Sequence, residues 1–370
     1  MCFLNPSASV LWDMHASGLD RDVIADVLVE CHGLDHCTAT NQIDMLMTQW
    51  GSAGLLEQVQ TTAGPASESV DTTGQDPQLL GACTANVVRV CLTAPDLFVN
   101  FCCDDASLFK CIASLLGPAV PGNSQRKPVR HLYLRGSPVC WQLWLDGVEA
   151  EQGGDRDSAI ATTIGALIGI GAMGHKSLAV IHGAALELPT GGGLLLVARG
   201  GSGKSTLATA LNARGLRMLH DDVIPVNSDG ALLGIAAPIC LKVGSWPVLE
   251  SYRPDLSDAP VLQRMGKQVC YLAALGGAVD RPLLPELLLF PKYDPASIAR
   301  LDLLTPDQVL QGLIETNTYI PPLTHQSFAS LARWVSAVPA YALSYPDLSS
   351  AIDWVGRLTS QPKLGATGVA

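Results

Sequence analysis

The spacing of hydrophobic and polar residues predicts two short helices near the N-terminus. The first follows residue 20, an Asp that can cap it, and the second begins at Thr40 or Asn41. Their apolar residues recur three or four positions apart, namely Val23, Ile24, Val27 and Leu28 in the first and Ile43, Leu46, Met47 and Trp50 in the second. Residues 1–58 are therefore predicted to form a small helical domain.

A polar stretch separates this part from the rest of the chain. Residues 57–78 contain almost no large apolar residue and are rich in Gly, Pro, Ser and Thr, a composition typical of a flexible linker. Beyond it, alternating or continuous apolar runs predict strands at residues 86–92, 97–103, 130–136 and 139–147. We therefore expect a linker over residues 59–80 and a β-rich region over residues 81–150.

The order of elements changes after residue 150. The uncharged run at 158–175 approaches the length of a membrane span, but its Gly, Ala and Thr content favours a buried, closely packed helix. Apolar strands at 177–188 and 193–198 follow, then a helix and a short strand at 216–219. Strand, loop, helix and strand in this order indicate an α/β fold. Residues 151–370 are thus predicted to form an α/β domain, closed by a helix at 347–358, with a mixed pattern after residue 231.

The composition narrows the classes of partner. The chain has 370 residues, of which 48% are hydrophobic and 15% charged, and its formal net charge is −11. This charge disfavours a nucleic acid or an anionic membrane as the main partner. The 11 cysteines are scattered, odd in number and without a CxxC pair, and no secretory signal pattern opens the chain. We therefore expect reduced thiols and a cytoplasmic protein.

One glycine-rich segment matches the phosphate-binding loop, or Walker A motif, between a buried strand and a helix. It consists of Ala198, Arg199, Gly200, Gly201, Ser202, Gly203, Lys204 and Ser205, with Thr206 next, and alanine replaces the commoner first glycine. Backbone N–H groups of such a loop converge on phosphate oxygens at a helix N-terminus. Lys204 adds charge at the β- and γ-phosphates, and the Ser205 hydroxyl can ligate Mg²⁺. The segment therefore predicts that the protein binds ATP and Mg²⁺.

Two adjacent carboxylates, Asp221 and Asp222, follow this loop closely in the sequence. They come at the C-terminal end of the strand predicted at 216–219, which is where open α/β sheets place their active sites. One carboxylate can hold Mg²⁺ while the other accepts a proton from an attacking hydroxyl. We assign Asp221 as the base and Asp222 as the metal ligand, with the exchanged roles left open. The alternative is a turn or a helix cap, where Asp is common.

The compact arrangement of loop and aspartates resembles the C-terminal catalytic domain of HPr kinase/phosphorylase and its relatives. The likeness spans residues 85–358 and extends to the upstream strand VIHGAALEL, where it implies that His182 lies near the γ-phosphate or the acceptor. It also implies that Lys242, in PICLKVGSW, and Lys292, in LLLFPKYDP, face the phosphates. A histidine buried on a strand and two solvated lysines are the alternatives. The family's glycine-arginine motif for phosphorolysis has no counterpart here, so phosphorylase activity is not implied.

The N-terminal segment is similar to the PqqD-like, winged-helix-like domains that recognise peptides. The likeness covers residues 3–58 and rests on Asn5-Pro6, Trp12 and the closing stretch WGSAGLL. It implies that a leader peptide binds as an added strand. The family's own strands precede its Asn-Pro, whereas here only a few residues do. A helical appendage that merely packs on the catalytic part is the alternative.

Together these patterns and resemblances imply an ATP-dependent kinase. The expected reaction transfers the γ-phosphoryl group to a Ser or Thr hydroxyl of a peptide or protein, such as a ribosomally made, lasso-type precursor peptide. One alternative is a regulatory serine kinase of an HPr-like carrier protein. Another is a nucleotide-dependent binding or assembly module without phosphotransfer. The resemblance also allows a homo-oligomer.

Overall fold

The computed structural model describes residues 21–32, 36, 39–40, 43–44, 47, 86–93, 97–116, 130–174, 176–264, 266–277, 279, 281–316, 318–321 and 325–360. It divides into two compact units, Met1–Gly74 and Gln75–Ala370. In the first unit, helix α2 (Arg21–His32) confirms the first helix predicted from the sequence. The second predicted helix is described only in part and is helical at residues 43, 44 and 47. The linker at 59–80 lies outside the described residues, as does most of the PqqD-like segment.

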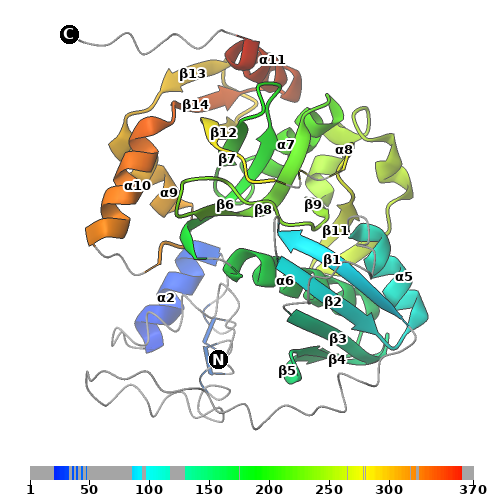
Figure 1. Ribbon diagram of the computed structural model, residues 1–370. Coiled ribbons are helices and arrows are strands. Elements are labelled where there is room, and N and C mark those ends of the chain that lie inside the picture. The colour runs from blue at the N-terminus through cyan, green and yellow to red at the C-terminus, as the bar shows by residue number, and fades with distance from the viewer. Residues whose placement is uncertain are drawn as a thin grey trace, which may run out of the picture. The chain divides into compact units, whose positions relative to one another are not determined.

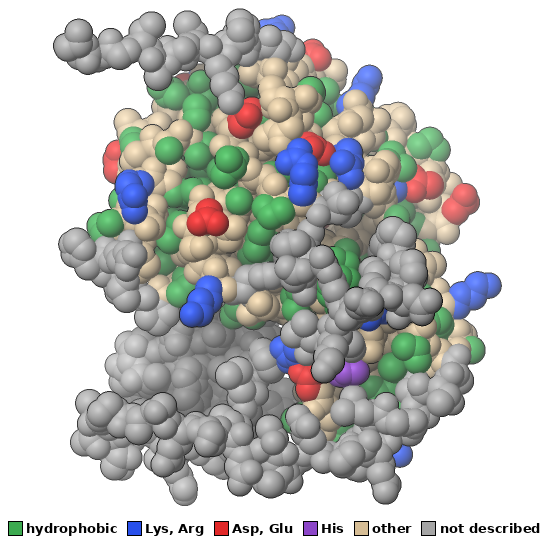
Figure 2. All heavy atoms as spheres, in the orientation of Figure 1, with side chains coloured by type: hydrophobic (Ala, Val, Ile, Leu, Met, Phe, Trp, Pro, Cys, Tyr) green, Lys and Arg blue, Asp and Glu red, His purple; other side chains and the backbone are tan. Residues whose placement is uncertain are grey.

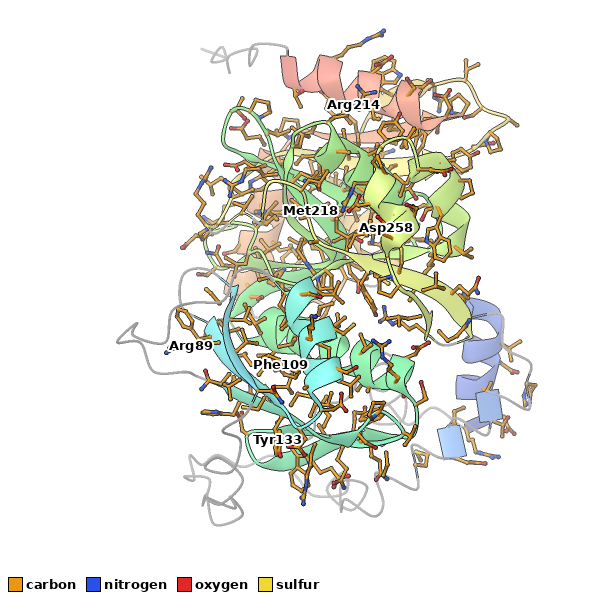
Figure 3. All side chains as sticks on the ribbon, turned by 90° about the vertical axis from the view of Figure 1, so that its right-hand side faces the viewer. Arg89, Phe109, Tyr133, Arg214, Met218 and Asp258 are labelled. Carbon is orange, nitrogen blue, oxygen red and sulfur yellow. The ribbon has the colours of Figure 1, made fainter. Side chains whose placement is uncertain are left out.

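The second unit begins with a five-stranded sheet whose strands follow chain order. The strands are β1 (Val87–Thr93), β2 (Leu97–Cys103), β3 (Arg130–Ser137), β4 (Cys140–Leu145) and β5 (Val148–Gly153). Neighbouring strands are antiparallel except β2 and β3, which are parallel and are connected through helix α5 (Ala106–Leu115). Phe109 of α5, labelled in Figure 3, stacks on Phe101 of β2 with ring centroids 6.0 Å apart. The four strands predicted in this region are confirmed.

The uncharged run forms helix α6 (Arg156–Met173), which begins at Asp155, whose side chain accepts a hydrogen bond from the backbone of Ser158. Its apolar side chains join the core beneath the five-stranded sheet. This confirms the prediction of a buried helix. None of the helices in the described part of the chain is long and apolar enough to cross a membrane. The domain boundary predicted at residue 150 stays a prediction, because both sides of it lie in one compact unit.

A six-stranded sheet forms the centre of the α/β part, in the order β13-β14-β12-β7-β6-β8. Its strands are β6 (Ser177–Glu187), β7 (Gly193–Val197), β8 (Arg217–Asn227), β12 (Pro285–Tyr293), β13 (Arg300–Leu303) and β14 (Ala340–Tyr345). Strands β7, β12 and β14 are parallel, whereas β6 is antiparallel to both β7 and β8. The segment after residue 231, whose sequence pattern is mixed, therefore contributes three strands to this sheet.

Helices cover both faces of the six-stranded sheet (Figure 1). Leucines and alanines of α7 (Lys204–Ala213) pack in one core with α11 (Leu348–Ser360). Helices α9 (Pro306–Glu315) and α10 (His325–Ala337) contribute to the core of the opposite face. Met218 of β8, labelled in Figure 3, is buried on the α7 side. The fold of this unit is therefore α/β, as predicted.

A small antiparallel sheet connects the two larger ones. It consists of β9 (Ile239–Lys242), β10 (Val261–Arg264) and β11 (Lys267–Leu272), in the order β10-β11-β9. The short helices η2 (Val243–Ser245), α8 (Trp246–Leu249) and η3 (Pro254–Asp258) lie between β9 and β10. Alternate residues of the sheet enter the core of the five-stranded sheet on one side and the core around α7 on the other.

Charges of both signs are scattered over the face of the molecule drawn in Figure 2.

Candidate active site

The glycine-rich segment forms a loop between the buried strand β7 and helix α7. Gly203 precedes the helix with φ = 88°, a left-handed conformation that residues with a Cβ rarely adopt. A Cβ built on Gly203 would lie 2.5 Å from the Tyr345 hydroxyl oxygen. Both the backbone angle and the available space therefore require glycine at this position.

Hydrogen bonds fix the loop internally and to a neighbouring strand. The Ser202 hydroxyl donates to the Arg199 carbonyl oxygen at 2.7 Å, and the Tyr293 backbone N–H donates to the Ser202 carbonyl oxygen at 3.2 Å. Tyr293 is the last residue of β12, so this bond places the exposed Lys292 beside the loop. Arg199 forms an ion pair with Glu315 at the end of α9, at 3.2 Å.

Lys204, the first residue of α7, carries an ammonium group in an unusual environment. Only 6% of the residue is exposed, and Nζ has no hydrogen-bond partner within the described residues. Burial lowers the pKa of Lys204, while the charges of Asp221 and Asp222 oppose that shift. Lys242 lowers the same pKa further, so this exposed lysine also acts on the site. A buried cation without a hydrogen-bonded anion suits a site for phosphate.

The structure corrects the strand predicted at residues 216–219. Strand β8 continues to Asn227, and the aspartate pair lies in its interior rather than at its end. The reason is the long partner strand β6, which pairs with β8 along nearly its whole length and so keeps the backbone extended beyond Asp222. Asp222 nevertheless lies level with the end of β7, where the glycine-rich loop begins. It lies opposite Gly183, and Gly183 lies opposite Val197, the last residue of β7 before the phosphate loop.

The two aspartates have contrasting environments. Asp221 is 3% exposed, its Oδ1 has no hydrogen-bond partner in the described part of the chain, and burial raises its pKa to about 6 against the attraction of Lys204. For Asp222, burial acts in the same direction, but the contact with His182 outweighs it and lowers the pKa to about 2. In this contact, His182 Nδ1 and Asp222 Oδ1 are 3.2 Å apart. Neighbouring carboxyl groups whose pKa values are driven apart are typical of acid–base sites.

The backbone at Asp222 is also unusual. Its φ of 101° makes it one of two non-glycine residues with positive φ among those described. Such strain persists where the surrounding structure holds a residue in place, and it is common at functional sites. Pairing of β8 with β6, together with the His182 contact, holds Asp222 in this conformation.

Four further side chains lie near the pair, and the sequence assigned them no role. His220 precedes it on β8, is 2% exposed, and burial lowers its pKa to about 4, so its ring is neutral. The other three, Cys240, Arg264 and Tyr271, come from the small three-stranded sheet and are coupled electrostatically to Asp222. These three residues belong to no local sequence motif. Pairing between strands that are distant in the sequence brings them towards the site.

The arrangement fits a nucleotide with its magnesium ion. Glycine-rich backbone, a helix N-terminus and the buried Lys204 suit phosphates. Ser205 and the aspartates supply hydroxyl and carboxylate oxygens, the ligand types that Mg²⁺ prefers. Among the residues that the structure describes, no group of three or more His, Cys, Asp or Glu side chains is placed to hold a metal ion. A Mg²⁺ ion in such a site takes its remaining ligands from water and substrate phosphates.

These features define an α/β protein with a glycine-rich loop beside a pair of aspartates. No protein-family model matches the chain, and no curated protein matches it. Among solved structures, it is similar to the Hpr(Ser) kinase/phosphatase from Coxiella burnetii, with 16% sequence identity and a TM-score of 0.21. That similarity covers 48% of this chain and 96% of the other. We therefore infer the reaction from the geometry of the site.

Proposed function

We propose that residues 75–370 form a phosphotransferase that moves the γ-phosphoryl group of ATP to a hydroxyl of a peptide or protein. The observation that carries this proposal is the electrostatic coupling of the buried Lys204 ammonium, which has no hydrogen-bond partner among the described residues, to two carboxylates with opposite pKa shifts, beside a glycine-rich loop. A protein that only binds nucleotide needs the loop but no proton acceptor beside it. Transfer to a hydroxyl also needs a group that accepts the proton.

In this reaction Mg·ATP supplies the phosphoryl group: an O–P bond forms at the acceptor hydroxyl, the bond from the γ-phosphorus to its bridging oxygen breaks, and ADP leaves. Loop backbone N–H groups and Lys204 would bind the phosphates. Asp221 would accept the hydroxyl proton, because a pKa of about 6 leaves it ionised yet basic at neutral pH. Asp222, with its low pKa, stays ionised and would ligate Mg²⁺ together with Ser205.

His182 would orient Asp222 through its Nδ1 contact. Lys242 and Lys292 are both exposed and lie on strands that border the loop or the aspartates, so they would bind outer phosphate oxygens. An interaction between Ser205 and Asp221 supports the exchanged assignment, with Asp221 on the metal. The magnesium dependence of the two asparagine variants described in the Discussion separates these assignments.

The acceptor is proposed on the resemblance of residues 3–58 to peptide-recognition domains. A leader-bearing, ribosomally made precursor peptide fits that resemblance, and strand addition would tether it to the enzyme. A Ser or Thr hydroxyl within the tethered peptide would then be phosphorylated. A homo-oligomer remains part of the proposal only through the family resemblance.

Comparison of the wild type with Lys204→Ala tests the proposal, using radiolabelled ATP, Mg²⁺ and a library of serine- and threonine-containing peptides. We expect labelled phosphoester in the wild type, none in the variant, and weaker binding of a non-hydrolysable ATP analogue to the variant. Lys110→Ala, an exposed lysine on α5, is the matched control and should behave as wild type. ADP formation that needs no acceptor and labels no peptide would instead favour a nucleotide-driven binding module.

A further inference from the structure

One basic residue, Arg264, is coupled electrostatically to Asp222 but has no role in the phosphotransfer proposed above. Arg264 ends strand β10, is half-buried, and donates from Nη1 to the Cys240 sulfur at 3.6 Å. None of the ion pairs formed by described residues involves Arg264. A guanidinium group has five N–H donors, so most of its hydrogen-bonding capacity is left for another partner.

The small sheet holds Arg264 next to the strand that carries the aspartates. Across the large sheet the loop follows β7, then come β6 with His182 and β8 with Asp222, and β9 packs against β8. Cys240 lies on β9, directly opposite Tyr271 of β11. Because β9 packs against both β8 and helix α7, and Cys240 accepts a hydrogen bond from Arg264, the small sheet holds Arg264 close to the strand of the aspartate pair, where an attacking hydroxyl would approach.

Electrostatics agree with this placement. Burial works against the charge of Arg264, but Tyr271, Cys240 and then Asp222 raise the pKa of the guanidinium above its ordinary value. Tyr271 is 2% exposed, and its hydroxyl has no hydrogen-bond partner in the part of the chain that the structure describes. The small sheet thus combines a half-buried cation with a buried tyrosine.

The chemistry of the Arg264 side chain suits an oxyanion. A half-buried guanidinium is costly unless an anion pairs with it, and its planar fork matches carboxylate or phosphate oxygens. Lys267 lies opposite Arg264 in the β10–β11 register, and Lys242 ends β9 at the same edge of the small sheet. This edge is locally basic although the whole chain carries a formal charge of −11.

We propose that Arg264 binds an oxyanion carried by the acceptor next to the hydroxyl that is phosphorylated, either an Asp or Glu carboxylate or an already phosphorylated residue. The enzyme would thereby select acidic sequences around its target serine or threonine. This inference rests on the proposed phosphotransfer and adds the substrate class to it. Cys240 accepts a hydrogen bond from one nitrogen of the guanidinium, which leaves the remaining N–H groups available to the acceptor.

The test uses the full chain and a peptide library with one central serine. Each flanking position carries in turn Asp, Glu, phosphoserine, Asn, Gln or Ala, and transfer of labelled phosphate is measured. We expect the wild type to favour an anionic residue over its amide counterpart at one flanking position. Arg264→Gln should raise KM for that anionic peptide about 10- to 100-fold, the scale of a charge-assisted hydrogen bond, with kcat unchanged. Preference for phosphoserine over Asp and Glu, or the reverse, identifies the source of the oxyanion.

Two variants and one binding measurement control the test. Lys110→Gln, at an exposed lysine of α5 outside the small sheet, removes an equal charge and should keep the selectivity. Arg264→Lys, which keeps the charge but lacks the fork, should lose part of it. Unchanged affinity of each variant for a non-hydrolysable ATP analogue shows that the site is folded. A wild type that phosphorylates peptides without acidic preference, or an Arg264→Gln or Arg264→Lys variant that keeps the full preference, would overturn the inference and leave the phosphotransferase intact. A wild type that phosphorylates none of the peptides would overturn both.

Discussion

At the scale of single residues, the two aspartates differ enough to be separated by experiment. Asp221→Asn and Asp222→Asn keep the side-chain size and remove the charge. Each should lower kcat at least about a hundredfold, the scale expected for losing a general base. The Asp222→Asn variant should in addition need more Mg²⁺ for half-maximal activity, because it loses an ionised ligand, whereas Asp221→Asn should not.

A magnesium titration of both variants under saturating ATP makes this comparison. Asp353→Asn, at an exposed carboxylate on α11, is the control and should match the wild type. A raised Mg²⁺ requirement in Asp221→Asn alone would exchange the two roles. Near-wild-type rates in both variants would show that the pair is purely structural.

Individual site residues were predictable from the sequence where a local motif marks them. Gly203, Lys204 and Ser205 belong to one continuous pattern, and Asp221 and Asp222 follow it closely. Arg264 and Tyr271 belong to no such sequence motif. They reach the site only because β10 and β11 pair with β9, which packs on β8.

At the scale of elements, the start of α7 depends on one glycine. Gly203→Ala would place a Cβ 2.5 Å from the Tyr345 hydroxyl oxygen and force alanine into φ = 88°. The left-handed conformation alone costs about 1–2 kcal/mol for a residue with a Cβ. We expect a lower midpoint of thermal unfolding and weaker binding of an ATP analogue.

A double variant separates the two causes. Gly203→Ala with Tyr345→Phe removes the hydroxyl and should recover the part of the loss that comes from the close contact. Gly244→Ala is the control, because a Cβ there meets nothing within 4 Å and its φ is not positive. Full stability and full nucleotide affinity in Gly203→Ala would contradict the loop geometry described above.

Elements with a strong local pattern were predicted better than those set by their partners. Strands β6 and β7 and helix α7 show clear apolar runs and periodicity, and the structure confirms them. The strand containing Met218 was predicted too short, because the polar run of His220 and the aspartates interrupts its apolar pattern. Only its pairing with β6 shows that the strand continues. Short strands such as β9 and β13 depend on neighbours far away in the sequence in the same way.

At the scale of the whole molecule, residues 75–370 form a compact unit with their own cores. A fragment that starts at residue 75 should therefore fold and bind nucleotide. If the N-terminal unit recruits a leader peptide, its removal lowers the effective concentration of the tethered acceptor. We expect a raised KM for a full-length precursor and unchanged kinetics for a short acceptor peptide that lacks a leader. Equal losses on both peptides would show that the N-terminal unit supports the fold rather than recognition.

The central claim is that the site transfers a phosphoryl group to a hydroxyl, and one quantitative measurement tests it most directly. ADP release and peptide phosphoester are measured together, with and without acceptor peptide, in the wild type and in Lys204→Ala. The account predicts that ADP release in the wild type depends on the acceptor and equals the phosphoester formed, and that Lys204→Ala produces neither. ADP release at the same rate without acceptor, or transfer that survives in Lys204→Ala, would contradict it.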